Sequence, residues 1–146
     1  MSGFPTGVAI VTALADGEPA GATVNAVTSL SLDPPLMLAA LDRGSRTLRA
    51  IERAGLFGIN GLLAGQGELA RAFASKNPVA EKWTGVGWHE ADGSPRIDGG
   101  GVWVACGLES VIPAGDHVIV TGSVQKVEPS NDPPLVFVRG EYRALG

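Results

Sequence analysis

The chain has 146 residues, a length that fits one domain and leaves little room for a second. Hydrophobic residues make up 45% and charged residues 18%, which excludes a disordered chain and allows a buried core. The net charge of −4 has the wrong sign for following nucleic-acid phosphates or an anionic membrane surface. We therefore expect a single domain over residues 1–146 that binds neither nucleic acid nor membrane.

The few cysteine and histidine residues and the lack of a signal-peptide pattern exclude further classes of protein. Cys106 is the only cysteine and the chain has two histidines, which excludes an internal disulfide and a structural zinc site. The sequence shows no signal-peptide pattern, and no window approaches the ~20 apolar residues of a membrane span. We expect a cytoplasmic protein without a bound metal.

The first part of the chain predicts three strands separated by glycine and proline turns. Residues 7–14 form a run of β-branched residues. Residues 21–32 mix polar and apolar side chains, which predicts one continuous strand with a polar face, ended by Asp33-Pro34-Pro35. Residues 36–41 are all apolar, which indicates a buried strand.

Two short helices follow. Ser45 is a good N-cap and Gly55 a good residue to end a helix, so residues 46–54 are predicted to be helical. A second helix is predicted over about 65–75, and a strand over 56–60 lies between the two. The stretch after Asn77-Pro78 is typical of a loop.

The last part of the chain predicts a long hairpin. Residues 102–112 and 117–127 have strand patterns and flank a turn at Pro113-Ala114-Gly115-Asp116, and residues 135–138 predict a final strand. About seven strands with two helices predict a mainly β fold. We expect a closed antiparallel barrel, because closure removes the exposed edges of a sheet.

The sequence lacks several common catalytic motifs. It contains neither the glycine-rich nucleotide-binding motifs nor the nucleophile elbow of serine hydrolases. Because acid and base residues are also few, chemistry supplied by an organic cofactor becomes attractive.

Three patterns could bind ligand, although each is by itself more common as plain structure. Ser45-Arg46-Thr47 begins a helix, where an anion would be stabilised, but a capped helix with a solvated arginine would look the same. Polar residues at alternate positions of the 21–32 segment could line a pocket or face water. His117, in Gly115-Asp116-His117, could be functional or a hydrogen-bonded turn residue.

Taken together, these segments resemble the flavin reductase family of short FMN-binding split barrels, the reductase components of two-component flavin-dependent monooxygenases. The resemblance rests on FPTGVAIVTA (4–13), GATVNAVTSLSLDPPLMLAALDRGSRT (21–47), FGIN (57–60), GQGELARAFASK (65–76), GDH (115–117) and RGEY (139–142). It covers nearly the whole chain. It implies an NAD(P)H:flavin oxidoreductase that reduces FMN or FAD with NADH or NADPH, is a homodimer, and supplies reduced flavin to a monooxygenase.

The resemblance also implies the site residues. His117 and Tyr142 take the positions beside the nicotinamide and are the candidate catalytic residues. The candidate flavin-binding residues are Thr23, Val24, Asn25, Ala26 and Ser29 at the ring, Leu41, Asp42, Ser45, Arg46 and Thr47 at the phosphate and ribityl chain, and Asn60, Gln66 and Lys76 elsewhere. Glycines beside these segments, such as Gly21 and Gly44, would allow close approach of the backbone to a ligand.

Two features depart from the family pattern. Only Met1, Ser2 and Gly3 precede FPTG, where the family usually carries a helix. Glu141 stands where a basic residue commonly precedes the tyrosine, and it would repel the phosphates of a dinucleotide if it faced them.

Two other functions remain open. The same barrel could hold a flavin as a carrier or sensor without reducing it. It could also use a bound flavin to act on a dedicated small substrate.

Overall fold

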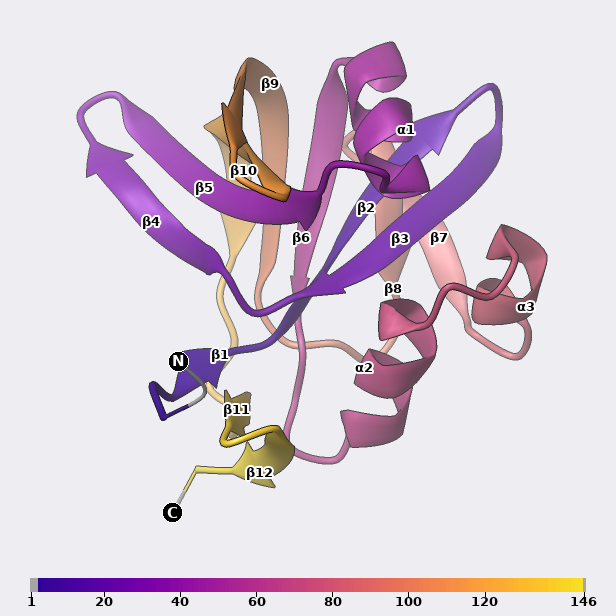
Figure 1. The fold of residues 1–146 in the computed structure, drawn as a ribbon, viewed down its shortest axis with the longest axis vertical. Coiled ribbons are helices and arrows are strands. Elements are labelled where there is room, and N and C mark those ends of the chain that lie inside the picture. The colour runs from indigo at the N-terminus through magenta and orange to yellow at the C-terminus, as the bar shows by residue number, and fades with distance from the viewer. Residues whose placement is uncertain (1–2, 146) are drawn as a thin grey trace.

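The computed structural model describes residues 3–145, and its centre is a seven-stranded antiparallel sheet (Figure 1). Its strands are β2 (Ala9–Ala15), β3 (Glu18–Val24), β4 (Val27–Leu32), β5 (Pro35–Asp42), β6 (Leu56–Gly61), β9 (Trp103–Ala114) and β10 (His117–Glu128). The order across the sheet is β3-β2-β6-β9-β10-β5-β4. The expectation of a mainly β fold is confirmed.

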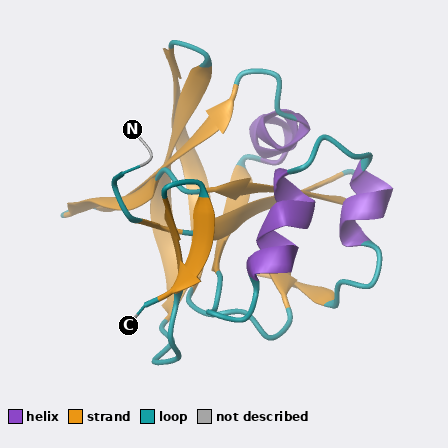
Figure 2. Cartoon of the chain, turned by 60° about the horizontal axis from the view of Figure 1, so that its bottom comes forward, coloured by secondary structure: helices purple, strands orange, loops and turns teal. Residues whose placement is uncertain are grey.

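Smaller elements surround this sheet. Strands β1 (Thr6–Gly7), β11 (Leu135–Val138) and β12 (Glu141–Ala144) form a three-stranded sheet, and β7 (Trp88–Ala91) pairs with β8 (Ser94–Ile97). The helices are α1 (Arg46–Ala54), α2 (Gly67–Ala74) and α3 (Val79–Trp83). Figure 2 shows all three helices gathered on one side of the strands.

The core lies on both faces of β2. Consecutive residues of a strand point to opposite faces, so Val11 joins the cluster beneath α1 while Ile10 joins a second cluster around α2 and α3. In the second cluster, Phe73 and Trp83 meet edge to face with ring centroids 4.8 Å apart. This aromatic pair fixes α2 and α3 against β3.

The bounds and caps predicted for α1 are confirmed. The Ser45 hydroxyl accepts a hydrogen bond from the Leu48 N–H at 3.3 Å. At the other end, Gly55 has a left-handed φ of 72° and donates its N–H to the Ile51 carbonyl at 2.8 Å. Leu48 and Ile51 are buried beneath the helix. Through these residues α1 packs against β2, β3 and β6.

The continuous strand predicted over 21–32 is wrong. Asn25 and Ala26 interrupt it, and the two halves, β3 and β4, lie at opposite edges of the sheet. The Ala26 carbonyl accepts a hydrogen bond from the Ala40 N–H of β5 at 2.9 Å, so the chain crosses from one edge to the other at this point. The expected closure is therefore also wrong: the sheet is a split barrel with two edges.

The predicted loop after Asn77-Pro78 is also wrong. This segment contains α3 and the β7–β8 hairpin. The short strands β1 and β12 were not predicted either. The long hairpin is confirmed, but its strands continue through Pro113 and Ala114, leaving Gly115 and Asp116 as the turn.

Candidate functional site

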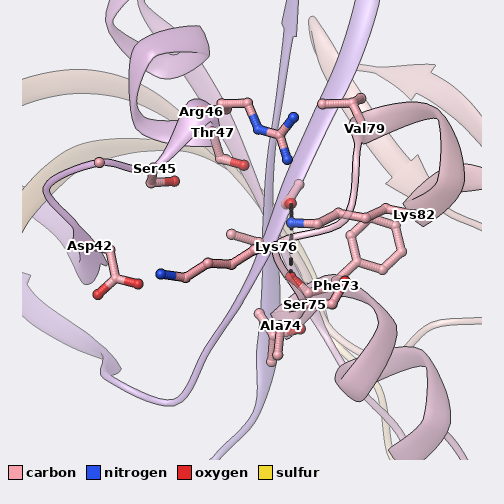
Figure 3. Close-up of a pocket in the computed structure, with 14 residues that line it drawn as sticks. Asp42, Ser45, Arg46, Thr47, Phe73, Ala74, Ser75, Lys76, Val79 and Lys82 are labelled. Atoms are coloured by element: carbon pink, nitrogen blue, oxygen red, sulfur yellow. Dashed lines mark hydrogen bonds between the residues drawn. The ribbon is translucent and has the colours of Figure 1, made fainter.

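A cavity of about 570 Å³ lies between the start of α1, strand β3 and the segment joining α2 to α3 (Figure 3). Its wall combines hydroxyl and cationic side chains with one carboxylate. The residues that line it are Gly21, Ala22, Thr23, Asp42, Gly44, Ser45, Arg46, Thr47, Phe73, Ala74, Ser75, Lys76, Val79 and Lys82. Six of the thirteen predicted flavin-binding residues are among them: Thr23, Asp42, Ser45, Arg46, Thr47 and Lys76.

The start of α1 supplies hydrogen-bond donors to this cavity. The first backbone N–H groups of a helix have no partner within it, and the helix dipole adds positive potential there. Ser45 and Thr47 place hydroxyls at the same point, and Thr47 is almost fully buried. Because the Ser45 oxygen accepts from Leu48, its hydroxyl hydrogen is available to an anion. These groups fit a phosphate.

Three cationic side chains share the cavity with Asp42: those of Arg46, Lys76 and Lys82. Arg46 donates to the Asn77 carbonyl at 2.7 Å, which ties its guanidinium to the segment joining α2 to α3. Lys82 donates to the carbonyls of Gly21 (3.5 Å) and Phe73 (3.3 Å). Burial, and after it the Arg46 charge, lowers the pKa of Lys82 below its ordinary value. The cavity is thus positive within a chain of net charge −4.

Two of the glycines predicted to approach a ligand line the cavity for different reasons. A Cβ on Gly21 would lie 2.9 Å from a ring carbon of Phe73 and 3.2 Å from one of Trp83, so an aromatic pair fills the space. A Cβ on Gly44 would meet nothing within 4 Å. Gly21 is therefore required because the Phe73 and Trp83 rings pack against its backbone, whereas the space beside Gly44 is open.

Thr23 connects β3 to α2. Its hydroxyl donates to the Ala70 carbonyl at 2.6 Å, which leaves its oxygen free to accept. Val24 and Leu41 are buried in the core, and Asn25, Ala26 and Ser29 are exposed outside the cavity lining. The structure does not bring these five residues into the cavity.

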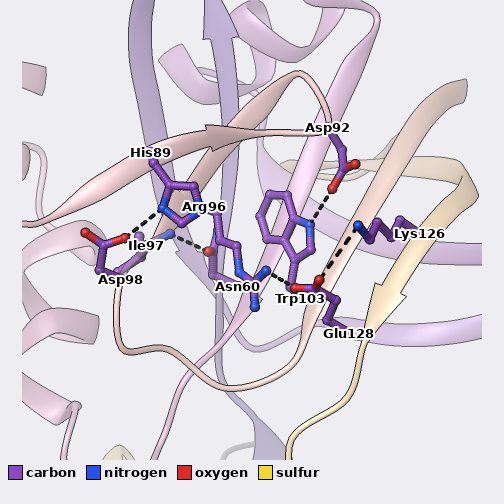
Figure 4. A network of polar contacts seen from close by, with 9 residues as sticks. All are labelled: Asn60, His89, Asp92, Arg96, Ile97, Asp98, Trp103, Lys126 and Glu128. Atoms are coloured by element: carbon purple, nitrogen blue, oxygen red, sulfur yellow. Dashed lines mark hydrogen bonds and ion pairs between the residues drawn. The ribbon is translucent and has the colours of Figure 1, made fainter.

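Asn60 and Gln66 are engaged in internal hydrogen bonds. The Asn60 amide nitrogen contacts the Ile10 carbonyl at 3.2 Å, the Thr12 hydroxyl at 3.3 Å and the Pro95 carbonyl at 3.4 Å. Its oxygen accepts from the Ile97 N–H at 2.8 Å (Figure 4). Asn60 thereby fastens the β7–β8 hairpin to the main sheet.

Gln66 closes the turn before α2. Its side-chain oxygen accepts from the Leu63 N–H at 2.8 Å, and its nitrogen donates to the Gly99 carbonyl at 3.1 Å. Both polar atoms of this side chain are therefore engaged outside the cavity.

His117 stands at the edge of the cavity, where β10 pairs with β5. Its Nδ1 lies 2.8 Å from an Asp116 carboxylate oxygen, and its Nε2 lies 3.5 Å from one of Asp42. The hydrogen bond and the charge of His117 lower the pKa of Asp116. Asp42 therefore contacts His117 and lines the cavity at the same time, which joins two predicted parts of the site.

Tyr142 lies on β12, beside Arg71 of α2 and outside the cavity lining. Its ring centroid is 5.2 Å from that of Phe137 and 5.4 Å from the Arg71 guanidinium carbon. Burial raises the pKa of its phenol, and the Arg71 charge partly opposes that rise. The neighbouring Glu141 accepts from Arg143 at 2.7 Å, so a cation offsets its charge.

Sequence reasoning missed Lys82 and Ser75, which also line the cavity. A lone lysine in a segment predicted as a loop carries no signal. Only the fold of α3 brings Lys82 back to β3.

The whole chain, residues 1–146, matches the flavin reductase like domain family. The chain belongs to this family. It is 44% identical over 142 residues to a flavin reductase of Pseudomonas putida, covering 95% of this chain and 82% of that protein. It is 39% identical to the flavin-dependent monooxygenase reductase subunit HsaB of Rhodococcus jostii, covering 97% and 73% of the two chains.

A solved structure shows the same fold. The NADH:FAD oxidoreductase SgcE6 of Streptomyces globisporus, in complex with NAD and FAD fragments, superposes with a TM-score of 0.91. The two chains are 30% identical, and the match covers 99% of this chain and 88% of that one.

No helix among residues 3–145 is long and apolar enough to cross a membrane. Nor, within these described residues, is a group of three or more histidine, cysteine or carboxylate side chains placed to hold a metal ion.

Proposed function

We propose that this protein is an NAD(P)H:flavin oxidoreductase that reduces FMN or FAD by hydride transfer and passes the reduced flavin to a partner monooxygenase. The observation that carries this proposal is the positive cavity at the start of α1, because its hydroxyls, free N–H groups and cations fit a phosphate ester. Family membership and the names of the relatives support the same activity.

The bound flavin and nicotinamide would supply the redox chemistry, and the protein would supply binding and orientation. Ser45, Thr47 and Lys76 would hold the flavin phosphate, leaving the Thr23 oxygen as an acceptor on the opposite wall. His117, held between Asp116 and Asp42, would orient the nicotinamide at the cavity edge. Tyr142, which lies outside the cavity lining beside Arg71, is the second residue proposed to contact the nicotinamide. No strong general acid is needed for this role.

We also propose that the protein is a homodimer. Leu30 and Leu32 of β4 are 47% and 89% exposed, on an edge strand that a second copy could cover. Sedimentation analysis of the purified chain tests this, with a monomer at micromolar concentration as the contradicting result.

Steady-state turnover tests the proposed activity. The purified protein is mixed with each pairing of FMN or FAD with NADH or NADPH, and oxidation of the nicotinamide is followed by absorbance. We expect flavin-dependent oxidation with at least one pairing. His117→Ala should lower kcat while leaving the flavin Kd largely unchanged, and an equal loss of both would contradict the role given to His117.

A further inference from the structure

Arg46 and Lys82 place two positive charges close together in the cavity, although they come from different elements. Arg46 begins α1 and is held by the Asn77 carbonyl. Lys82, on α3, is held by the carbonyls of Gly21 and Phe73. Figure 3 shows the guanidinium and the ammonium beside each other, and the lowered pKa of Lys82 has the Arg46 charge as one of its causes.

The two cations have no carboxylate partner in the described part of the chain. No Asp or Glu oxygen among residues 3–145 lies within 4.0 Å of their charged nitrogens. Two like charges held close together repel each other, and an anion between them would relieve that repulsion. Lys82 has three N–H donors and uses two on carbonyls, so one remains for a ligand.

Other donors of the cavity lie toward Asp42, away from Lys82. Ser45 lies on that side at the start of α1, the Lys76 ammonium extends toward Asp42, and the Thr47 hydroxyl lies between Ser45 and Arg46 (Figure 3). The cavity therefore offers donors for an anion at two places. A flavin with one phosphate could occupy only one of them.

We propose that Arg46 and Lys82 bind a second phosphate, so that the cavity accepts the diphosphate of FAD in preference to the monophosphate of FMN. This inference rests on the proposed function, because it assumes that the cavity holds a flavin. Lys82 is then a residue that determines flavin specificity. Arg46 contacts the second phosphate rather than the one held at Ser45 and Thr47.

Equilibrium titration with FAD, FMN and riboflavin, followed by flavin fluorescence, tests the proposal without turnover. Lys82→Met removes the charge and keeps an unbranched side chain. Lys126→Met is the matched control, since Lys126 pairs with Glu128 at 3.7 Å on another part of the surface. We expect Lys82→Met to weaken FAD binding about ten-fold or more, the size of one charged hydrogen bond, and FMN binding less than about three-fold.

Arg46→Gln provides a second test if Lys82→Met folds poorly, because Arg46 is exposed and makes one side-chain hydrogen bond. It should show the same selective loss of FAD. Equal losses for FAD and FMN would overturn the proposal, as would a wild-type protein that binds FMN more tightly than FAD. Selective loss of NADP⁺ over NAD⁺ binding, with FAD binding unchanged, would assign the pair to a dinucleotide phosphate and overturn it too. Absence of any flavin binding by the wild type would instead refute the proposed function.

Discussion

Asn60 offers the sharpest test of whether a predicted ligand residue has a structural role. Its side chain is 3% exposed, and its oxygen accepts from the Ile97 N–H at 2.8 Å. Asn60→Ala would leave that N–H buried without a partner, at a cost of about 1–3 kcal/mol. The loss of the amide contacts with Ile10 and Pro95 adds about 1 kcal/mol. We expect the free energy of unfolding to fall by roughly 2–4 kcal/mol in total.

Urea unfolding of the wild type and Asn60→Ala measures this difference, and flavin titration of the folded variant measures any direct role in binding. The structure predicts a large loss of stability with a flavin Kd within about three-fold of the wild type, under 1 kcal/mol. The reasoning is refuted if stability changes by less than about 0.5 kcal/mol, the usual range for surface positions, while flavin affinity falls ten-fold or more.

Three further outcomes are expected. Gly21→Ala should destabilise the fold by about 1–3 kcal/mol, because its Cβ meets the Phe73 ring, whereas Gly44→Ala should cost under about 0.5 kcal/mol; equal unfolding midpoints in urea would contradict this. Burial raises the pKa of Cys106 from 9.0 to about 12, so the folded state keeps the thiol proton at a pH where the unfolded chain has lost it. The free energy of unfolding should therefore fall as the pH rises from 9 toward 12, by at most about 1.4 kcal/mol per pH unit. Cys106→Ala should lack that part of the pH dependence, and an identical slope would refute the cause. Ser45→Ala should cost about 1 kcal/mol of stability through loss of the N-cap and also weaken phosphate-bearing flavins relative to riboflavin; unchanged selectivity would argue against a phosphate at α1.

Local signals predicted those elements that are fixed by local chemistry. Helix α1 has a capping serine, a terminal glycine and an apolar face, and its bounds agree with the structure. The β9–β10 hairpin was equally clear, since two long strand patterns flank a glycine turn. The break at Asn25 and Ala26 could not be predicted, because no proline or glycine marks it and because the crossing to the other edge of the sheet depends on pairing with β5.

The candidate site likewise contains residues that the sequence could predict and residues that only the folded chain brings in. The start of α1 was found because a capped helix with hydroxyls is visible in the sequence, and the structure places Lys76, predicted from the family resemblance, in the same cavity. Lys82 was missed because its position depends on α3, whose aromatic Trp83 packs on Phe73 rather than following a periodic pattern. Asn60 could be matched to a family position, but its four internal contacts are visible only in the folded chain.

Anaerobic mixing of the flavin-loaded protein with one equivalent of NADH or NADPH tests the central claim most directly. The proposed reductase should bleach the absorbance of bound FMN or FAD in proportion to the nicotinamide oxidised, one flavin for each nicotinamide. Tight flavin binding with no bleaching by either nicotinamide would contradict the claim and indicate a carrier or sensor instead.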